Sequence, residues 1–183
     1  MSASDPVVLF ERATTHAANV MSGVSLSQLK DATPCTDWNV QQLIDHMVAG
    51  SDYLLAALAG EPLAQRSGRT VGDYNHGLTE VRDGLRVPGG LERMCMSPLG
   101  FEWSVAYAVA GTFMDALIHT WDLATATGQD ATLDLELVDV CVVMFLPDMP
   151  ERGRAGGLVG PAVGVAADAS AQDRLLAAMG RRP

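Results

Sequence analysis

The stretch Met114-Asp-Ala-Leu-Ile-His-Thr-Trp-Asp-Leu-Ala124 places a carboxylate and an imidazole four residues apart, at Asp115 and His119. No proline or glycine interrupts it, so it predicts a helix on which both side chains project from one face, about one turn apart. Far upstream, the apolar segment Leu43–Val48 places His46 in a second predicted helix. Two histidines and a carboxylate could meet in a bundle and bind a metal ion. The alternative is a local Asp–His contact and a hydrogen-bonded core histidine.

The composition describes a folded chain of moderate size. It has 183 residues, of which 48% are hydrophobic and 19% are charged. We therefore expect a single domain spanning residues 1–183. The formal net charge of −10, from 12 basic and 22 acidic residues, would repel a phosphate backbone, so nucleic acid is not an expected partner.

The cysteines and the N-terminus indicate a cytoplasmic location. Cys35, Cys95 and Cys141 are odd in number and form no paired framework, which suits a reducing compartment. The first residues lack the basic and apolar regions of a signal peptide, and no run of about 18 apolar residues could span a bilayer. We expect no membrane partner, a small molecule as the ligand, and a homodimer as an open alternative to the monomer.

Hydrophobic periodicity predicts an all-α chain. Apolar residues recur at helical spacing in four long segments, and capping residues such as Ser4 or Asp5, followed by Pro6, stand where a helix should begin. Four such helices joined by loops predict an antiparallel bundle. The predicted helices are 6–21, 40–58, 70–85 and 104–127, with a further helix at 133–146 and a short one at 171–179.

The remaining segments are less regular. Residues 91–104 contain Pro98 and Gly100, which predicts a small hairpin or an irregular insert with Met94, Met96 and Phe101 facing inward. The helix at 133–146 is expected to bury Leu133, Leu137, Val140, Val143 and Met144. From Pro147 the chain is rich in glycine, proline and alanine, so extended chain is expected, in particular over residues 156–169.

Other residues with chemical potential are interpreted as structural. His16 lies at the edge of an apolar stripe and is expected to be a half-buried structural histidine, whereas His76 should be exposed. Cys35 has no basic neighbour in the sequence and is expected to be inert. Trp38, just before the second helix, is expected to pack on the end of the bundle.

Three motifs together resemble a known superfamily. The segments Thr33-Pro-Cys-Thr-Asp-Trp38, Leu43-Ile-Asp-His46 and Asp115–Gln129 resemble the DinB/YfiT-like proteins. More narrowly, they resemble actinobacterial single-domain relatives of the N-terminal, metal-binding domain of mycothiol-dependent maleylpyruvate isomerase. The resemblance implies an up-down-down-up four-helix bundle that binds a divalent metal ion through His46, Asp115 and His119. The acidic ligand of the isomerase is Glu, so the shorter Asp115 alters the reach and could shift metal preference.

The resemblance also implies a chemistry. Two neutral imidazoles and one carboxylate around a divalent ion give a net charge of about +1 and leave coordination positions open. Such an ion can bind a thiol as the thiolate, or lower the pKa of bound water towards about 7. We expect zinc, with nickel, iron or manganese as alternatives, and mycothiol or another low-molecular-weight thiol as cosubstrate of an S-transferase or isomerase. The isomerase has a further C-terminal domain, so its particular reaction is not carried over.

Other functions stay open at this point. The same three residues could belong to a non-catalytic stress-response protein that binds a metal or a small ligand. They could also support hydrolysis or non-haem Fe(II) oxygen chemistry, for which two histidines and a carboxylate are a known ligand set. A helical protein with no metal is the remaining alternative, and no catalytic residue is assigned.

Overall fold

The computed structural model describes residues 5–61 and 68–183, and the regular structure of the described chain is mostly helical. It divides into two compact units, one ending at Asp130 and the other beginning at Ala131. No described helix is both long enough and apolar enough to cross a membrane. The first unit contains α1 (Pro6–Ser22), the 3-10 helix η1 (Leu26–Gln28), α2 (Val40–Ala59), α3 (Val71–Leu85), β1 (Met94–Met96), β2 (Glu102–Ser104) and α4 (Val105–Thr127).

The four long helices begin and end where the sequence predicts, to within one or two residues. Each begins after a polar residue whose side chain accepts a hydrogen bond from a backbone N–H of the first turn, and these residues are Asp5, Asn39, Thr70 and Ser104. Ser4, the alternative cap of the first helix, lies outside the described residues. Two of the helices end at glycines in the left-handed conformation, Gly60 and Gly128, which residues with a Cβ rarely adopt.

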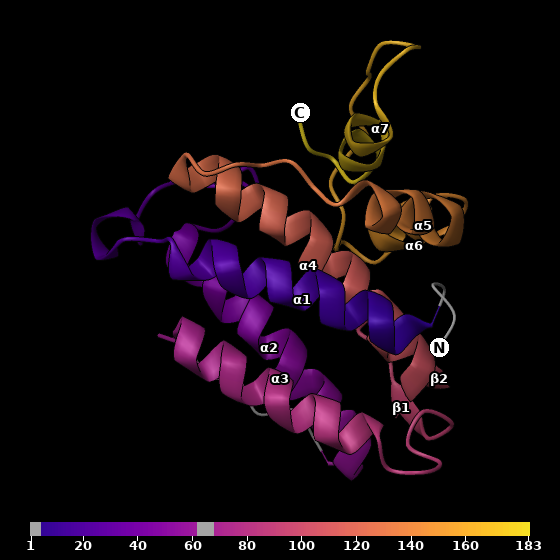
Figure 1. Ribbon diagram of the computed structural model, residues 1–183. Coiled ribbons are helices and arrows are strands. Elements are labelled where there is room, and N and C mark those ends of the chain that lie inside the picture. Colours follow the sequence, from indigo (N-terminus) through magenta and orange to yellow (C-terminus); the bar gives the residue numbers. More distant parts are fainter. Residues whose placement is uncertain (1–4, 62–67) are drawn as a thin grey trace. The chain divides into compact units, whose positions relative to one another are not determined.

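The first and last long helices of the bundle, α1 and α4, run parallel (Figure 1). Their C-terminal ends are tied together, because the Gln129 side chain donates a hydrogen bond of 2.9 Å to the carbonyl oxygen of Val20. Between the helices, aromatic and aliphatic side chains are fully buried, including Phe10, Phe113 and Leu117. Each such side chain contributes about 1.5–3 kcal/mol to stability when removed from water.

The second and third long helices, α2 and α3, complete an up-down-down-up arrangement. His46 of α2 faces Asp115 of α4, while Gly50 faces Thr112, so residue numbers rise along one helix as they fall along the other. Those two helices are therefore antiparallel. In contrast, Ser51 of α2 faces Gly77 of α3, and Leu58 faces Gly84 further along, so α2 and α3 are parallel.

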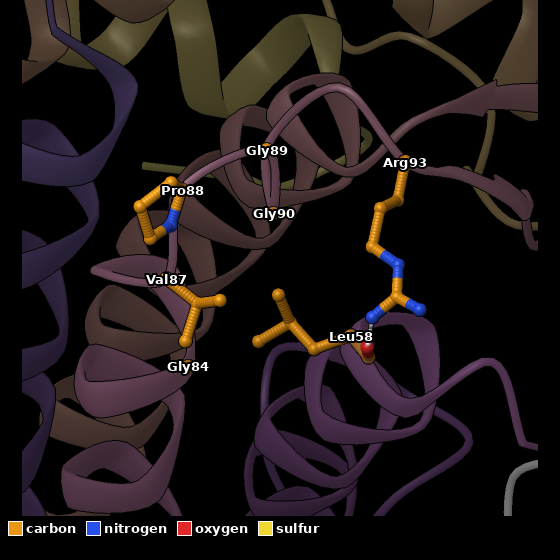
Figure 2. A pocket seen from close by; sticks show the side chains of 7 residues that line it. All are labelled: Leu58, Gly84, Val87, Pro88, Gly89, Gly90 and Arg93. Atoms are coloured by element: carbon orange, nitrogen blue, oxygen red, sulfur yellow. Dashed lines mark hydrogen bonds between the residues drawn. The ribbon is translucent and has the colours of Figure 1, made fainter.

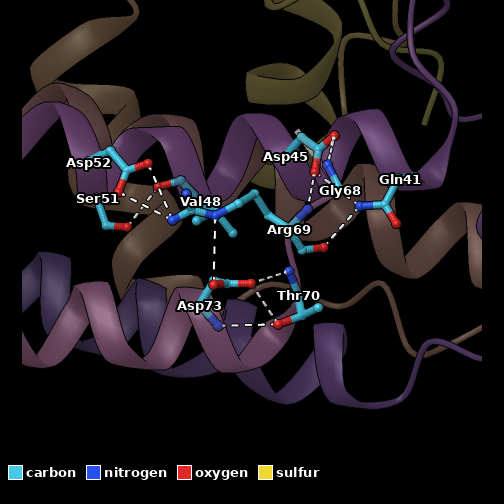
Figure 3. Close-up of polar contacts among 9 residues, drawn as sticks. All are labelled: Gln41, Asp45, Val48, Ser51, Asp52, Gly68, Arg69, Thr70 and Asp73. Atoms are coloured by element: carbon cyan, nitrogen blue, oxygen red, sulfur yellow. Dashed lines mark hydrogen bonds and ion pairs between the residues drawn. The ribbon is translucent and has the colours of Figure 1, made fainter. Parts of the chain in front are cut away.

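A parallel pair needs a connection that returns along the bundle, and a polar network anchors the end of this connection (Figure 3). The Asp45 carboxylate accepts hydrogen bonds from the backbone N–H groups of Gly68 and Arg69. The Arg69 guanidinium lies 3.3 Å from the carboxylate of Asp52 on α2 and 3.9 Å from that of Asp73 on α3. The network thus links both parallel helices to the described end of the connection, whose residues 62–67 lie outside the described chain.

The insert before α4 is a hairpin, as expected, but its inward face differs from the expected one. Met94, Met96 and Phe101 are 59%, 57% and 40% exposed, so their predicted inward orientation is wrong. Side chains alternate along a strand, and here the other face turns inward. The Trp103 indole N–H donates a hydrogen bond of 2.8 Å to the hydroxyl of Tyr53 on α2. A methionine side chain has no N–H or O–H group that could donate such a bond.

The second unit contains α5 (Leu135–Phe145), α6 (Met149–Ala155) and α7 (Ala171–Ala178). The predicted stripe of α5 is wrong in part, since Val143 and Met144 are exposed. Its buried residues are Leu137, Val138, Cys141 and Phe145. The short helix α6 was not predicted either, although proline in a first helical turn, as at Pro150, costs no hydrogen bond. Residues 158–166 contain no helix or strand, as expected.

Candidate metal centre

The structure brings together all three side chains that the sequence analysis selected. His46 lies in the second turn of α2, and Asp115 and His119 lie one turn apart on the facing side of α4. His46 Nε2 is 3.2 and 3.1 Å from the two carboxylate oxygens of Asp115, and His119 Nε2 is 3.4 Å from Asp115 Oδ1. One donor atom from each of the three residues lies within 4.8 Å of both others.

These distances fit a tetrahedral metal ion. Zinc–nitrogen bonds of about 2.0–2.1 Å place neighbouring ligand atoms about 3.3 Å apart at the corners of a tetrahedron. From one oxygen of Asp115, Oδ1, the Nε2 atoms of His46 and His119 lie 3.2 and 3.4 Å away, close to that value, and a ring nitrogen of each histidine lies within 4.8 Å of the other. The side chains of His46 and Asp115 are 34% and 36% exposed, whereas that of His119 is 8% exposed. An ion held here would have solvent on one side, where further ligands could bind.

Asp122 holds the buried imidazole in place. Its carboxylate is fully buried and lies 2.8 Å from His119 Nδ1. Metal-binding histidines usually donate their second N–H to a carboxylate or carbonyl, which fixes the ring and leaves the other nitrogen for the ion. Asp122 meets this requirement at three residues beyond His119 in the same helix. Helical spacing alone puts Asp122 on the same face as His119, but it indicates no role for this carboxylate.

The cluster is an ion-pair network in the absence of metal. Burial by itself opposes ionisation of Asp115, but the imidazoles of His46 and His119 outweigh it and hold the pKa of this carboxyl well below its usual value. Burial likewise lowers the pKa of His119, but the carboxylates of Asp115 and Asp122 more than compensate and raise that pKa to about 9. The proton of His119 therefore occupies a position where a cation could replace it.

A short closed loop covers the cluster. The Val40 N–H bonds to the Asp31 carbonyl, and the Thr33 hydroxyl lies 2.8 Å from the carbonyl oxygen of Trp38, which closes the loop on itself. The Trp38 ring lies with its centroid 4.4 Å from that of His46 and 5.6 Å from that of His119. Trp38 thus packs against both histidines, a contact that the predicted role on the bundle end did not include.

The same loop positions a thiol. Cys35, His119 and Asp122 form a second group of candidate ligands, in which one donor atom of each residue lies within 4.8 Å of the others. Cys35 is half-buried. Sequence spacing could not reveal this neighbour, since 84 positions separate Cys35 from His119 and only the loop closure brings them together.

The other histidines lie outside both groups found among residues 5–61 and 68–183. His16 is half-buried and His76 is exposed, as expected, and the latter lies 3.7 Å from Glu80. A pocket of about 300 Å³ lies elsewhere, between the C-terminal end of α2 and the loop after α3 (Figure 2). Leu58, which lines the pocket, lies twelve residues beyond His46, about 18 Å along the helix, so the pocket is separate from the candidate metal-binding cluster.

Comparisons with known proteins identify the family of this chain. Two uncharacterized proteins of Mycobacterium tuberculosis, MT0763 of strain CDC 1551 / Oshkosh and Rv0738 of strain ATCC 25618 / H37Rv, are each 34% identical over 135 residues, covering 73% of this chain and 73% of theirs. The family model of the mycothiol maleylpyruvate isomerase N-terminal domain matches residues 10–86, which include His46. The chain belongs to this family.

A solved structure supports the fold of the family. The crystal structure of a histidine-to-alanine variant of the mycothiol-dependent maleylpyruvate isomerase superposes with a TM-score of 0.61 at 13% sequence identity. The match covers 78% of this chain and 68% of the isomerase chain. The similarity confirms the expected DinB-like four-helix bundle.

Proposed function

We propose that this chain is a divalent-metal protein that uses the ion to bind and activate a low-molecular-weight thiol, in an S-transferase or isomerase type of reaction. The observation that supports this most directly is the convergence of His46, Asp115 and His119, whose ligand atoms lie within 4.8 Å of one another, with both Nε2 atoms 3.2–3.4 Å from Asp115 Oδ1. Family membership adds to it, because the related isomerase is named as mycothiol-dependent. Zinc is the proposed ion, and nickel, iron or manganese are the alternatives.

The proposed role of each residue follows from how exposed its side chain is. His119 is buried and fixed by Asp122, so it would hold the ion from the protein side. His46 and Asp115 are partly exposed, so the open positions would face solvent, where a small molecule can approach. When bound, an ion with this ligand set would favour the thiolate form of a thiol at neutral pH. Trp38 would restrict the rotation of both imidazoles by packing against them.

The first test is elemental analysis of protein purified without added metal and without an affinity tag. We expect about one divalent ion per chain in the wild type and a large loss in His46→Ala. The matched control is His76→Ala, which removes an exposed histidine from outside the cluster and should leave the metal content unchanged. Equal metal content in wild type and His46→Ala would contradict the proposed site.

The second test addresses catalysis. Metal-loaded protein is incubated with mycothiol, bacillithiol or glutathione and an electrophile such as a haloarene, and loss of free thiol is followed. We expect metal-dependent loss with at least one thiol, abolished in Asp115→Asn, which removes the anionic ligand while keeping its size. Metal binding without thiol loss for any of the three would exclude thiol transfer to that electrophile.

A second candidate is a non-catalytic metal-binding protein of the stress response. It is favoured by the position of the cluster, which joins α2 to α4 and would stabilise the bundle when filled. An ion present at 100 times its dissociation constant stabilises the folded state by about 2.7 kcal/mol. A melting temperature that falls steeply on chelation, together with no turnover, would favour this role over the first.

A further inference from the structure

The imidazole of His119 lies between two sets of candidate ligands. Its Nε2 faces Asp115, at 3.4 Å, and belongs to the outer cluster with His46. Its Nδ1 faces Asp122, at 2.8 Å, and Cys35 joins these two residues in the inner group. The outer set offers nitrogen and oxygen ligands, whereas the inner set adds sulfur.

The more buried of the two ligand sets is also the one that would give an ion complex of lower net charge. A divalent ion with two neutral imidazoles and one carboxylate has a net charge of about +1, which suits the partly exposed outer cluster. With a thiolate, a carboxylate and one imidazole the charge is about zero, which suits the inner group, where Asp122 is fully buried and His119 nearly so. A neutral ion complex is the one that a buried position tolerates.

One imidazole cannot serve both sets at once. A neutral imidazole has a proton on one nitrogen and a lone pair on the other. When Nδ1 carries the proton and donates a hydrogen bond to Asp122, the lone pair of Nε2 can bind an ion at the outer cluster. When Nε2 carries the proton, directed at Asp115, Nδ1 is free for an ion at the inner group. The two sites therefore require opposite tautomers of His119, and an ion at one site excludes an ion at the other.

We propose that Cys35, His119 and Asp122 form a second cation site, selective for thiophilic ions, that competes with the outer site for His119. Thiolate ligands favour the softest cations, such as cadmium and copper(I), whereas the nitrogen and oxygen set accepts borderline and harder ions such as zinc and manganese. Binding at the inner site displaces the thiol proton of Cys35 to solvent, since a coordinating thiol is deprotonated. Filling the inner site leaves the outer one with only two of its three ligands.

Cadmium is the probe, since its bond to a thiolate produces a charge-transfer absorption in the ultraviolet. Titration of reduced wild-type protein should give this band with one ion bound per chain. Cys35→Ser should lose the band while still binding one ion through the outer cluster. The matched control is Cys95→Ser, a half-buried thiol outside both groups, which should keep the full band.

The outer site is tested separately. In His46→Asn the cadmium–thiolate band should persist, whereas manganese binding should fall at least tenfold. Absence of the band in wild type, its survival in Cys35→Ser, or binding of two cadmium ions per chain would overturn the proposal. If Cys35→Ser fails to fold, alkylation of wild-type Cys35 replaces it: cadmium should slow that modification at least tenfold and leave Cys95 unaffected, and equal rates would overturn the site.

Discussion

The metal-free protein should lose stability as the pH rises from about 6 to about 9.5, because of a single imidazole. The pKa of His119 lies at about 9 in the folded chain against an ordinary value of 6.5. A raised pKa means that the proton stabilises the folded state below about pH 6.5, and that this contribution disappears as the pH passes about 9. Each pKa unit is worth about 1.4 kcal/mol, so the loss amounts to about 3 kcal/mol. Solvent screens this interaction little, since the His119 side chain is 8% exposed.

The measurement is urea unfolding in the presence of a chelator at about pH 6, 7.5 and 9.5. The reference is His119→Gln, which keeps a polar side chain beside Asp122 but cannot titrate. We expect the stability difference between wild type and variant to shrink by about 3 kcal/mol across this range. Saturating zinc should remove the loss in the wild type, because an ion prefers the neutral imidazole that high pH produces. A difference that stays constant with pH would refute the assigned protonation of His119.

Three further predictions concern side chains around the cluster and the bundle. Asp122→Asn should weaken zinc binding 10- to 100-fold in competition with a chromophoric chelator, because the amide no longer fixes the His119 tautomer as strongly; unchanged affinity would contradict this role. Arg69→Met should lower the free energy of unfolding by about 2 kcal/mol, whereas Arg86→Met, which removes an exposed ion pair, should change it by less than about 0.5 kcal/mol. Gly77→Ala should lower the free energy of unfolding in urea by about 1–2 kcal/mol, because the added methyl would lie 2.6 Å from Ser51 Oγ. This loss should outweigh the higher helix propensity of alanine. A stabilised variant would show that the parallel helices can separate freely.

The second unit shows where periodicity alone misleads. The residues Val143 and Met144 fit a helical stripe in the sequence, yet both are exposed, and the buried face is one that includes Cys141 and Phe145. A short, strongly apolar helix has several faces that could be buried. Which one is buried depends on the partner helix, and here α5 packs with α7.

The hairpin before α4 illustrates the same limit at a smaller scale. Alternation along a strand predicts two faces but not which of them turns inward. Apolar character favoured the methionines, whereas the structure turns Trp103 inward because its N–H finds a partner in Tyr53. A hydrogen bond between residues fifty positions apart decided the orientation, and no local pattern contains that information.

The sequence by itself predicted the positions of the four long helices and selected the three side chains of the candidate centre. Capping residues define where the helices begin, helical spacing puts Asp115 and His119 on one face, and the family motif adds His46. The tertiary structure alone decided that Trp38 and Cys35 cover the same histidine and that Asp122 fixes its ring. The physical reason is that helix formation depends on residues within one or two turns, whereas a centre with two alternative ligand sets depends on how a closed loop and two antiparallel helices pack together.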